Sequence, residues 1–359
     1  MPSGKLLGMW FGLLCTASAL ACAQTYTVQT IGVLKGDNEN SGFWINNLGE
    51  IVGCSDTATT EGYPCTGTVA GQHAFLWSRA TGMRDLGTLA GGNVSGAQGI
   101  NDLGMVVGYS NAGGHPATDF FAFQWTKSGG MVNLGTLPGG PSSAAFEVNS
   151  AGVVSGDSFI SNGAVNATSW SGGKIKNLGA LPNAIFTAGL NINDSGYVVG
   201  ESVFSYGPPF KSHAFFWNGL AIKDLGTLTG GLTSVANAIN TTGVIVGQSD
   251  STASAGHWHA VMWDASHKIH DLGVLPGGNY SVAFSVNDFN VAVGYGNIGN
   301  NAAHAMIWNA TGGLQDLNSL IPLHSGWVLI NANSINNLGQ ITGYGRIGGY
   351  NRAFLLTPQ

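Results

Sequence analysis

Short apolar runs alternate with glycine- and asparagine-rich turns along almost the whole chain. Typical runs are Ala-Phe-Leu-Trp at residues 74–77 and Val-Val-Gly at residues 106–108, each bounded by Gly, Asn, Asp or Ser. Runs this short, rich in β-branched and aromatic residues and closed by turn residues, are typical of β-strands. The pattern therefore predicts an all-β fold.

The runs recur in a fixed order. The Ala-Phe-x-Trp run or a variant of it begins seven times, 45 to 48 residues apart, at Ala74, Ala122, Ala167, Ala214, Ala260, Ala305 and Ala353. An Ile-Asn or Val-Asn element also occurs seven times, ending at Asn46, Asn101, Asn149, Asn193, Asn240, Asn287 and Asn336. Four short runs in a period of this length are typical of a propeller blade. We predict a seven-bladed β-propeller with four antiparallel strands per blade, occupying residues 24–359 as a single domain.

The two ends of this region complement each other. Residues 26–34 resemble the last run of a copy, with Ile31-Gly32 at its Leu-Gly position, whereas the final copy lacks that run. We expect the N-terminal strand to complete the last blade and close the ring, because this arrangement removes an open sheet edge.

Two columns of aligned turn residues indicate backbone with positive φ, which glycine and, next best, asparagine tolerate. One follows each Ile-Asn element by three residues: Gly49, Gly104, Gly152, Gly196, Gly243, Asn290 and Gly339. The other ends the Leu-Gly pairs: Gly87, Gly135, Gly179, Gly226 and Gly273, with Asn318 in the sixth copy.

Two further columns predict how the copies pack. Small residues precede each Ile or Val of the Asn element by three positions, and they fit an innermost strand near a crowded axis: Gly42, Ala97, Ala145, Gly189, Ala236, Ala283 and Ala332. Large rings suit the wider space between blades further out, so we interpret six tryptophans as packing residues: Trp77, Trp125, Trp170, Trp217, Trp263 and Trp308.

The N-terminus predicts export. Lys5, an apolar stretch over residues 6–21 and the small-x-small sequence at residues 21–23 are typical of a signal peptide, which we assign to residues 1–23. A lipoprotein anchor on Cys22 is an alternative, although Ala19 stands where a lipobox usually has Leu. We expect a secreted protein, with the periplasm or cell surface as further destinations. The two cysteines left after cleavage, Cys54 and Cys65, predict a local disulfide.

Composition excludes several partners. Charged residues make up 8% of the chain against about 25% in ordinary soluble domains, and the 12 Lys and Arg residues form no basic run. Because a nucleic-acid backbone needs clustered cations, we expect no nucleic-acid partner. After the signal region no apolar run approaches the ~20 residues of a membrane helix, so we expect no transmembrane segment. We also expect a monomer.

Four copies carry His before the Ala of the aromatic run, at His73, His213, His259 and His304. With the flanking Asp-Leu-Gly-Thr-Leu and Ile-Asn-x-x-Gly runs, these His-Ala-Phe triplets resemble the HAF-repeat family of bacterial extracellular proteins across the mature chain. The resemblance implies export and a repeat scaffold, and it implies no catalytic residue. Asn166 and Arg352 replace the His in two copies, so the His cannot be a ligand that every copy requires.

One acid departs from its column. Glu147 stands on a predicted innermost strand where the other copies have Trp44, Gly99, Asn191, Ala238, Ser285 and Ser334. A glycosidase needs a second carboxylate at roughly 5–10 Å, and the sequence places none beside Glu147. His257, His259, His267 and His270 lie near one another in sequence, but strand spacing places the two pairs toward opposite faces of a blade. We predict no metal site and no cofactor.

Exposed aromatic residues in the longer loops favour binding over catalysis. Rings flanked by Asn, Ser and Gly suit stacking on sugars or contact with proteins, and the candidates are Tyr63, Phe204, Tyr206, Phe210, Trp258, Tyr280 and Trp327. The alternative for each ring is that it packs under its own loop. The sequence thus predicts a non-catalytic binding or scaffold protein with an extracellular glycan or protein as ligand. Two alternatives are a polysaccharide hydrolase or lyase that uses Glu147, and a cell-surface structural protein without a small ligand.

Overall fold

The computed structural model describes residues 24–56, 71–116, 118–254 and 256–359. In these ranges the regular structure is β-strand, apart from one 3-10 helix, η1 (Leu317–Ser319). The first strands in chain order are β1 (Tyr26–Thr30), β2 (Glu39–Ile45), β3 (Ile51–Asp56), β4 (His73–Ser78), β5 (Gly82–Gly87), β6 (Ser95–Ile100), β7 (Val106–Asn111), β8 (Phe120–Thr126), β9 (Gly130–Asn133), β10 (Ser143–Val148), β11 (Val154–Phe159), β12 (Val165–Ser171), β13 (Lys174–Gly179) and β14 (Phe186–Ile192).

The second half of the chain continues the same order of short strands. They are β15 (Val198–Ser205), β16 (Lys211–Trp217), β17 (Ile222–Gly226), β18 (Ser234–Ile239), β19 (Ile245–Ser249), β20 (His259–Trp263), β21 (Ile269–Gly273), β22 (Ser281–Val286), β23 (Ala292–Asn297), β24 (Ala303–Asn309), β25 (Gly313–Asp316), β26 (Val328–Ile335), β27 (Ile341–Ile347) and β28 (Tyr350–Pro358).

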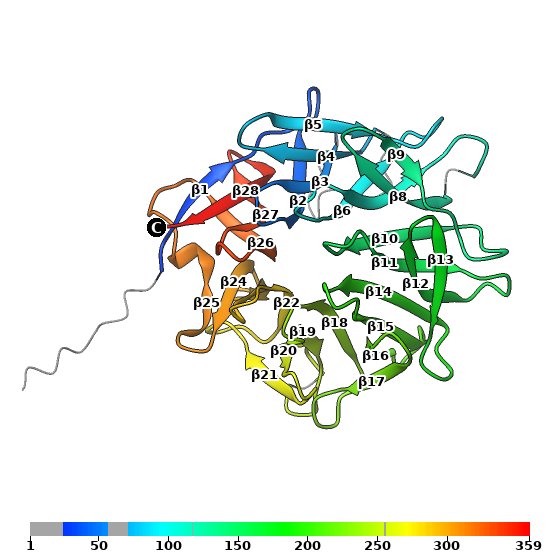
Figure 1. The fold of residues 1–359 in the computed structure, drawn as a ribbon. Coiled ribbons are helices and arrows are strands. Elements are labelled where there is room, and N and C mark those ends of the chain that lie inside the picture. Colours follow the sequence, from blue (N-terminus) through cyan, green and yellow to red (C-terminus); the bar gives the residue numbers. More distant parts are fainter. Residues whose placement is uncertain (1–23, 57–70, 117, 255) are drawn as a thin grey trace, which may run out of the picture.

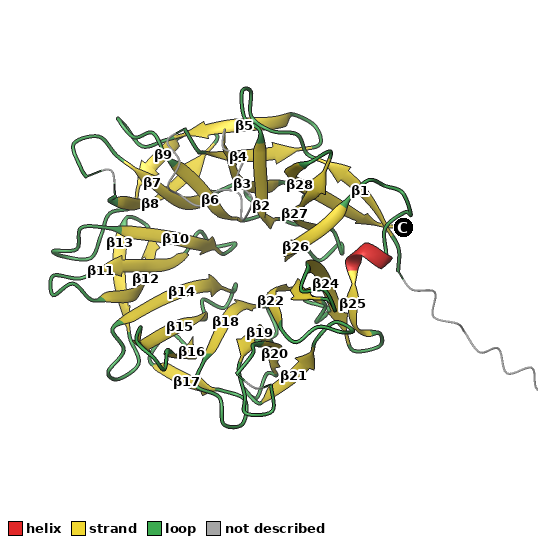
Figure 2. Cartoon of the chain, turned by 180° about the vertical axis from the view of Figure 1, so that it is seen from behind, coloured by secondary structure: helices red, strands yellow, loops and turns green. Residues whose placement is uncertain are grey.

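The strands form antiparallel groups of four. Five groups are separate sheets: β2–β5, β6–β9, β18–β21, β22–β25, and β26–β28 with β1. The remaining two, β10–β13 and β14–β17, join through a single parallel pair, Val165 with Phe186. Figures 1 and 2 show the groups arranged around a central axis, with β2, β6, β10, β14, β18, β22 and β26 nearest to it. The fold is an all-β propeller-type repeat structure.

The N-terminal strand lies where the sequence predicts it. β1 pairs antiparallel with β28, from Tyr26 opposite Pro358 to Thr30 opposite Phe354, so it is the outer strand of the last sheet. Tyr26 is also buried in the apolar cluster of that sheet. The first and last strands of the described chain thus share one sheet.

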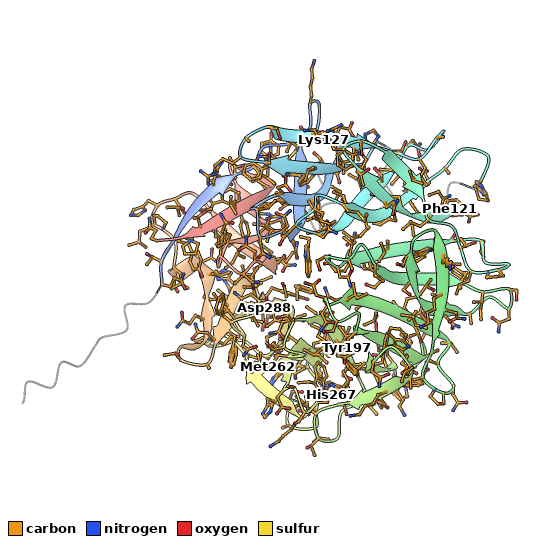
Figure 3. All side chains as sticks on the ribbon, viewed as in Figure 1. Phe121, Lys127, Tyr197, Met262, His267 and Asp288 are labelled. Atoms are coloured by element: carbon orange, nitrogen blue, oxygen red, sulfur yellow. The ribbon has the colours of Figure 1, made fainter. Side chains whose placement is uncertain are left out.

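Apolar clusters fill the space between successive sheets, and Figure 3 shows side chains throughout these layers. One cluster joins Val52 and Ala74 of the first sheet to Ala97, Ile100 and Phe123 of the second. The tryptophan column packs in the same layers: five members are at most 9% exposed and Trp308 is partly buried. Their predicted packing role is confirmed.

The small-residue column is also tightly enclosed. Its five alanines are fully buried, and a Cβ added at Gly42 would lie 2.3 Å from Oγ1 of Thr342 in the neighbouring sheet. Because real Cβ contacts do not approach so closely, a larger residue here would push two sheets apart.

The positive-φ prediction holds at every position but one. The six glycines and Asn290 after the Asn element have φ between 59° and 86°, and the five Leu-Gly glycines also have positive φ. The prediction of a positive φ at Asn318 is wrong. This residue lies in η1 and is not among the described non-glycine residues with positive φ. Its side chain binds Leu329 instead, accepting from N at 2.7 Å and donating to O at 2.9 Å, which fixes the start of β26.

Candidate functional site

Seven asparagines form a ring of hydrogen bonds around the axis. Each Nδ2 donates to the backbone carbonyl of the asparagine in the next group, at 2.9–3.2 Å, and Asn336 donates to Asn46. Each Oδ1 accepts the backbone N–H groups two and four residues later, which holds the turn after the strand. All seven side chains are buried. The Asn element therefore ties each turn to its own strand and to the neighbouring group.

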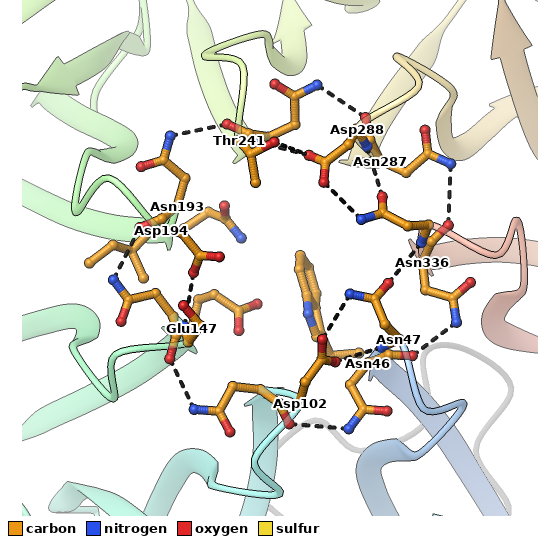
Figure 4. Close-up of a pocket in the computed structure, with 18 of the residues that line it drawn as sticks. Asn46, Asn47, Asp102, Glu147, Asn193, Asp194, Thr241, Asn287, Asp288 and Asn336 are labelled. Atoms are coloured by element: carbon orange, nitrogen blue, oxygen red, sulfur yellow. Dashed lines mark hydrogen bonds between the residues drawn. The ribbon is translucent and has the colours of Figure 1, made fainter.

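The residue after each asparagine forms a rim around the same opening, as Figure 4 shows. Asp102 accepts from N and Nδ2 of Asn47, at 2.8 and 3.0 Å. Asp288 accepts from Thr241 through one oxygen and from Asn337 through the other. Asp194 accepts from N of Ser150 at 2.9 Å. The rim carboxylates thus bind backbone and side-chain groups of neighbouring turns.

Within this rim lies an axial pocket of about 180 Å³. Its wall contains the Asn ring, apolar residues at the ends of the innermost strands, Trp44, and four carboxyl groups, those of Asp102, Glu147, Asp194 and Asp288. Figure 4 shows the Glu147 side chain directed into the ring. Glu147 was the acid that its column singled out in the sequence, and the structure places it in this pocket.

A β-bulge gives Glu147 this orientation. The register of β10 and β11 shifts between Ala145 and Glu147, and the other six innermost strands shift at the equivalent position. A bulge redirects the side chains that follow it. Because glycine stands at position 99 of the neighbouring strand β6, the carboxyl group has room: a Cβ there would lie 2.8 Å from Oε1 of Glu147.

Glu147 differs from its column in what it binds. Asn191, Ser285 and Ser334 each accept a backbone N–H from the next group, at 3.1–3.4 Å. Glu147 instead accepts from its own neighbour, Val148 N, through Oε1 at 2.9 Å. Its Oε2 is buried and has no hydrogen-bond partner among the described residues. Burial raises the pKa of Glu147 well above its usual value, against a smaller lowering effect of the Val148 bond.

Two other acids, both partly buried, were missed in the sequence. Burial raises the pKa of Asp157 to about 7, and it also raises the pKa of Glu201. Both follow the glycine of the Val-x-Gly run, where other copies have Cys54, Tyr109, Gln248, Tyr295 and Tyr344. The sequence could have revealed them, because at this aligned position two copies have an acid where the other five have Cys, Tyr or Gln. Neither residue lines the axial pocket.

Three of the predicted aromatic residues lie exposed on the loop side, at the opposite ends of the strands from the Asn ring. Tyr206 is 66% exposed, Phe210 38% and Trp258 40%. Tyr206 and Phe210 share the β15–β16 loop, with ring centroids 6.4 Å apart. Thr233 connects them to Trp258, because it bridges Ser212 and accepts from Nε1 of Trp258 at 2.9 Å. We call Tyr206, Phe210 and Trp258, together with the 42% exposed Leu232 that precedes Thr233, the aromatic surface.

The other predicted rings pack against neighbours. Phe204 lies edge-on to His213 and under Nζ of Lys211, Tyr280 contacts Tyr295, and Trp327 packs on Phe354. Phe204, Lys211 and His213 also line a cavity of about 370 Å³ beside the aromatic surface. Tyr63 lies outside the described residues. The loop prediction therefore places three rings on a common surface and three in packing contacts.

The histidines of the His-Ala-Phe triplets have structural partners. Nδ1 of His73, His213, His259 and His304 lies 2.6–2.9 Å from the aspartate on the next strand, Asp85, Asp224, Asp271 and Asp316 respectively. Where a copy lacks the His it also lacks the Asp, as in the Asn166–Asn177 pair. Among the described residues no group of three or more His, Cys, Asp and Glu side chains is placed to hold a metal ion.

Cys54 is fully buried in β3 and is disulfide-bonded. Cys65 and the predicted signal peptide lie outside the described residues, so the Cys54–Cys65 pairing and the cleavage site remain predictions. No helix in the described part of the chain is both long and apolar enough to cross a membrane.

No protein-family model and no curated protein matches the chain. Solved structures do. A puromycin-hydrolysing peptidase of Mycobacterium tuberculosis has a TM-score of 0.52 at 13% identity, over 89% of this chain and 52% of the peptidase. YCF48 bound to D1 peptide gives 0.47 at 12% identity, over 92% and 94%. The lectin of Aleuria aurantia, a six-bladed β-propeller that recognises fucose, gives 0.37 at 11% identity, over 73% and 94%. The chain spans about half the length of the peptidase, and at such identity this likeness concerns the fold alone.

Proposed function

We propose that this chain is a secreted, non-catalytic, closed seven-bladed β-propeller of the HAF-repeat type that binds a glycan through the aromatic surface. The seven groups of four strands support the blade count. Closure is supported by the pairing of β1 with β28 and by the Asn ring, whose last member bonds back to the first. A ring closed in this way makes a rigid frame, and loops on a rigid frame are the usual place for binding residues.

The aromatic surface carries the proposal. Three rings project from loops of two adjacent groups, and two features fix their positions: the Ser212–Thr233 bridge and the indole hydrogen bond. Sugar rings present apolar C–H faces that stack on aromatic side chains, while their hydroxyl groups require polar neighbours. Polar groups of this kind are available on the same two groups of strands: Lys211 begins β16, Thr229 lies between β17 and β18, and Thr252 shares the β19–β20 loop with Trp258. The alternative is a protein ligand, and the test must distinguish it from a glycan.

The test compares variants at this surface on a glycan array and by calorimetry. Trp258→Ala and a Tyr206→Ala/Phe210→Ala double variant should each weaken binding of a glycan hit at least about tenfold. We take the stacking of a sugar face on a ring to be of the same order as that of a nucleic-acid base, roughly 1–3 kcal/mol. Phe289→Ala is the matched control, because Phe289 is 72% exposed but stands on the turn side near the Asn ring. An equal loss of binding in the Phe289→Ala control would show that the glycan does not bind at the aromatic surface. If no glycan on the array binds and a secreted protein is captured instead, the ligand is a protein.

A polysaccharide hydrolase or lyase is the second candidate, favoured by the raised pKa of Glu147, which suits a general acid. The catalytic mechanism of a glycosidase also needs a second carboxylate, and the acids near Glu147 are already engaged in hydrogen bonds. Asp102 and Asp288 accept hydrogen bonds through both oxygens, and Asp194 through one. If the candidate is right, Glu147→Gln abolishes any polysaccharide turnover of the purified protein. Turnover that survives this change rules out the assignment.

A further inference from the structure

The axial pocket presents one buried oxygen with nothing to bind. Oε2 of Glu147 has no partner among the described residues, although the side chain is only 4% exposed. An unpaired polar atom of this kind costs free energy unless a ligand or water satisfies it. The opposing residue on β11, Ser155, also has an unpartnered buried hydroxyl. Ser155 is not among the residues that line the pocket, so the unpaired oxygen of Glu147 alone marks the place where a hydrogen-bonding ligand fits.

The charge of the pocket selects the ligand's sign. Four of the 24 lining residues carry carboxyl groups, and none is Lys, Arg or His. Carboxylates around a low-dielectric opening concentrate cations and repel anions. Partial burial raises the pKa of Asp288, but hydrogen bonds from Thr241 and Asn337 outweigh it and lower that pKa, so this rim group is ionised at neutral pH. An anionic ligand is therefore excluded.

The lining also favours an organic cation over a metal ion. A metal needs several ligands from one cluster, and the described residues offer no group of three or more His, Cys, Asp and Glu side chains placed for one. An ammonium group needs only one carboxylate and neutral acceptors. The half-buried Trp44 and the Ile and Val residues at the strand ends supply an apolar wall for an alkyl chain, and an aromatic face also attracts a cation.

We propose that the axial pocket binds a primary ammonium group on a short alkyl chain, with Glu147 as its counter-ion. A pocket of about 180 Å³ suits a ligand of the size of a lysine side chain. At a pH below the pKa of Glu147, binding of the ammonium group requires the carboxyl group to release its proton to water; the carboxylate then pairs with the cation through Oε2. This site is independent of the aromatic surface, which lies at the other ends of the strands.

Several titratable groups surround Glu147 and must be separated from it. The pocket wall carries the three rim aspartates, Asp102, Asp194 and Asp288. On the strands packed against β10, namely β6, β7, β8, β11 and β14, the titratable side chains are those of Tyr109 and Asp157. A proton that these groups release would persist in a Glu147 variant. The comparison of wild type with Glu147→Gln therefore isolates the proposed proton.

The experiment is calorimetric titration of the full mature chain with n-butylammonium chloride, in buffers of different ionisation enthalpy. We expect binding that releases about one proton below the pKa of Glu147, with an affinity that rises up to tenfold per pH unit in that range. Glu147→Gln should weaken binding at least tenfold and remove the proton release. Glu201→Gln, which alters a partly buried acid outside the pocket, should leave both unchanged, and the uncharged isostere n-butanol should not bind.

Two further arms identify the source of the ammonium group. A short peptide with one lysine, compared with its acetyl-lysine form, tests a protein side chain, whereas butylammonium tests a free amine; selective binding of either supports the site and names its source. Binding of both the lysine peptide and butylammonium also supports the site. Equal affinity of Glu147→Gln and wild type, or binding of calcium chloride but of neither ammonium probe, overturns the proposal. If Glu147→Gln does not fold, the absence of proton release by the wild type is sufficient to reject it.

Discussion

The two ends of the strands use the same repeat in opposite ways. On the turn side every copy supplies an Asn that binds the next copy, and the following residue binds across the rim in most of them. On the loop side the copies differ in length and composition, and exposed rings gather on two adjacent groups. Agreement among copies therefore marks the frame, and departure from the common pattern marks the places where a ligand could bind.

Glu147 shows the same contrast within one column. Its equivalents Asn191, Ser285 and Ser334 accept an N–H group from the neighbouring sheet, so they belong to the frame. Glu147 keeps one oxygen unpaired in the axial pocket. At this position Glu147 therefore does not make the contact between neighbouring groups that Asn191, Ser285 and Ser334 make.

Of the variants that test the frame, one in the Asn ring should lower the free energy of unfolding most. Asn240→Ala removes the bonds to Asn287 and Asn290 and leaves the N–H groups of residues 242 and 244 without their acceptor. At roughly 1 kcal/mol for each of four bonds, we expect a loss of about 4 kcal/mol in the free energy of unfolding. Urea denaturation measures it. Asn300→Ala is the control, because the Asn300 side chain binds only the N–H of Ala302 on the surface; a similar loss in both variants would deny the ring its role.

Asp157, an acid at a position where most copies have a neutral residue, should make the free energy of unfolding depend on pH. Its folded-state pKa is raised to about 7, so between roughly pH 4 and pH 7 the folded protein keeps a proton that the unfolded chain has lost. The free energy of unfolding therefore falls as pH rises through this window. Asp157→Asn removes this cost. We expect its stability relative to wild type to improve by about 2 kcal/mol between pH 4 and pH 8, about half the limit set by the shift because the protein relaxes around a buried charge.

Parallel pH dependence of the two proteins would show that Asp157 titrates normally in the folded state. Asp250→Asn would be a poor control because Asp250 accepts two backbone N–H groups. Asp119→Asn is the better control, since Asp119 is partly exposed and lies in the loop before β8.

The smallest effect belongs to the His–Asp pairs at the sheet edges. His73 and Asp85 lie 2.9 Å apart with side chains 30% and 49% exposed, so solvent screens the pair and the coupling energy should be below about 1 kcal/mol in a double-mutant cycle. The bond to Asp85 raises the pKa of His73, against desolvation. The coupling should therefore be complete below about pH 6 and disappear as pH rises through the folded-state pKa of His73.

The double variant His73→Asn/Asp85→Asn copies the natural Asn166–Asn177 pair and should be nearly as stable as wild type at neutral pH. A coupling energy that does not change between pH 5 and pH 9 would show that the histidine charge has no part in it.

The sequence identified the columns of the frame but not all their roles. Glycine and asparagine three residues after each Asn element predicted the positive-φ turns, because few other residues adopt that backbone. Asn318 followed the same pattern and was mispredicted, since its side chain finds partners in β26 that lie beyond any local rule. The seven asparagines were visible as a column, yet their bonds cross to residues 44 to 290 positions away.

What the sequence determined by itself is therefore the repeat: its period, strand content, turn positions, packing tryptophans and the pairing of the first strand with the last sheet. Each of these follows from local backbone preference or from a side-chain pattern repeated seven times. The tertiary structure alone decided which oxygens are satisfied and which groups meet. Glu147 already stood out in its column, but its unpaired oxygen depends on three features of the tertiary structure. A bulge turns it inward, glycine at position 99 leaves it room, and turns from seven groups of strands converge at the axis.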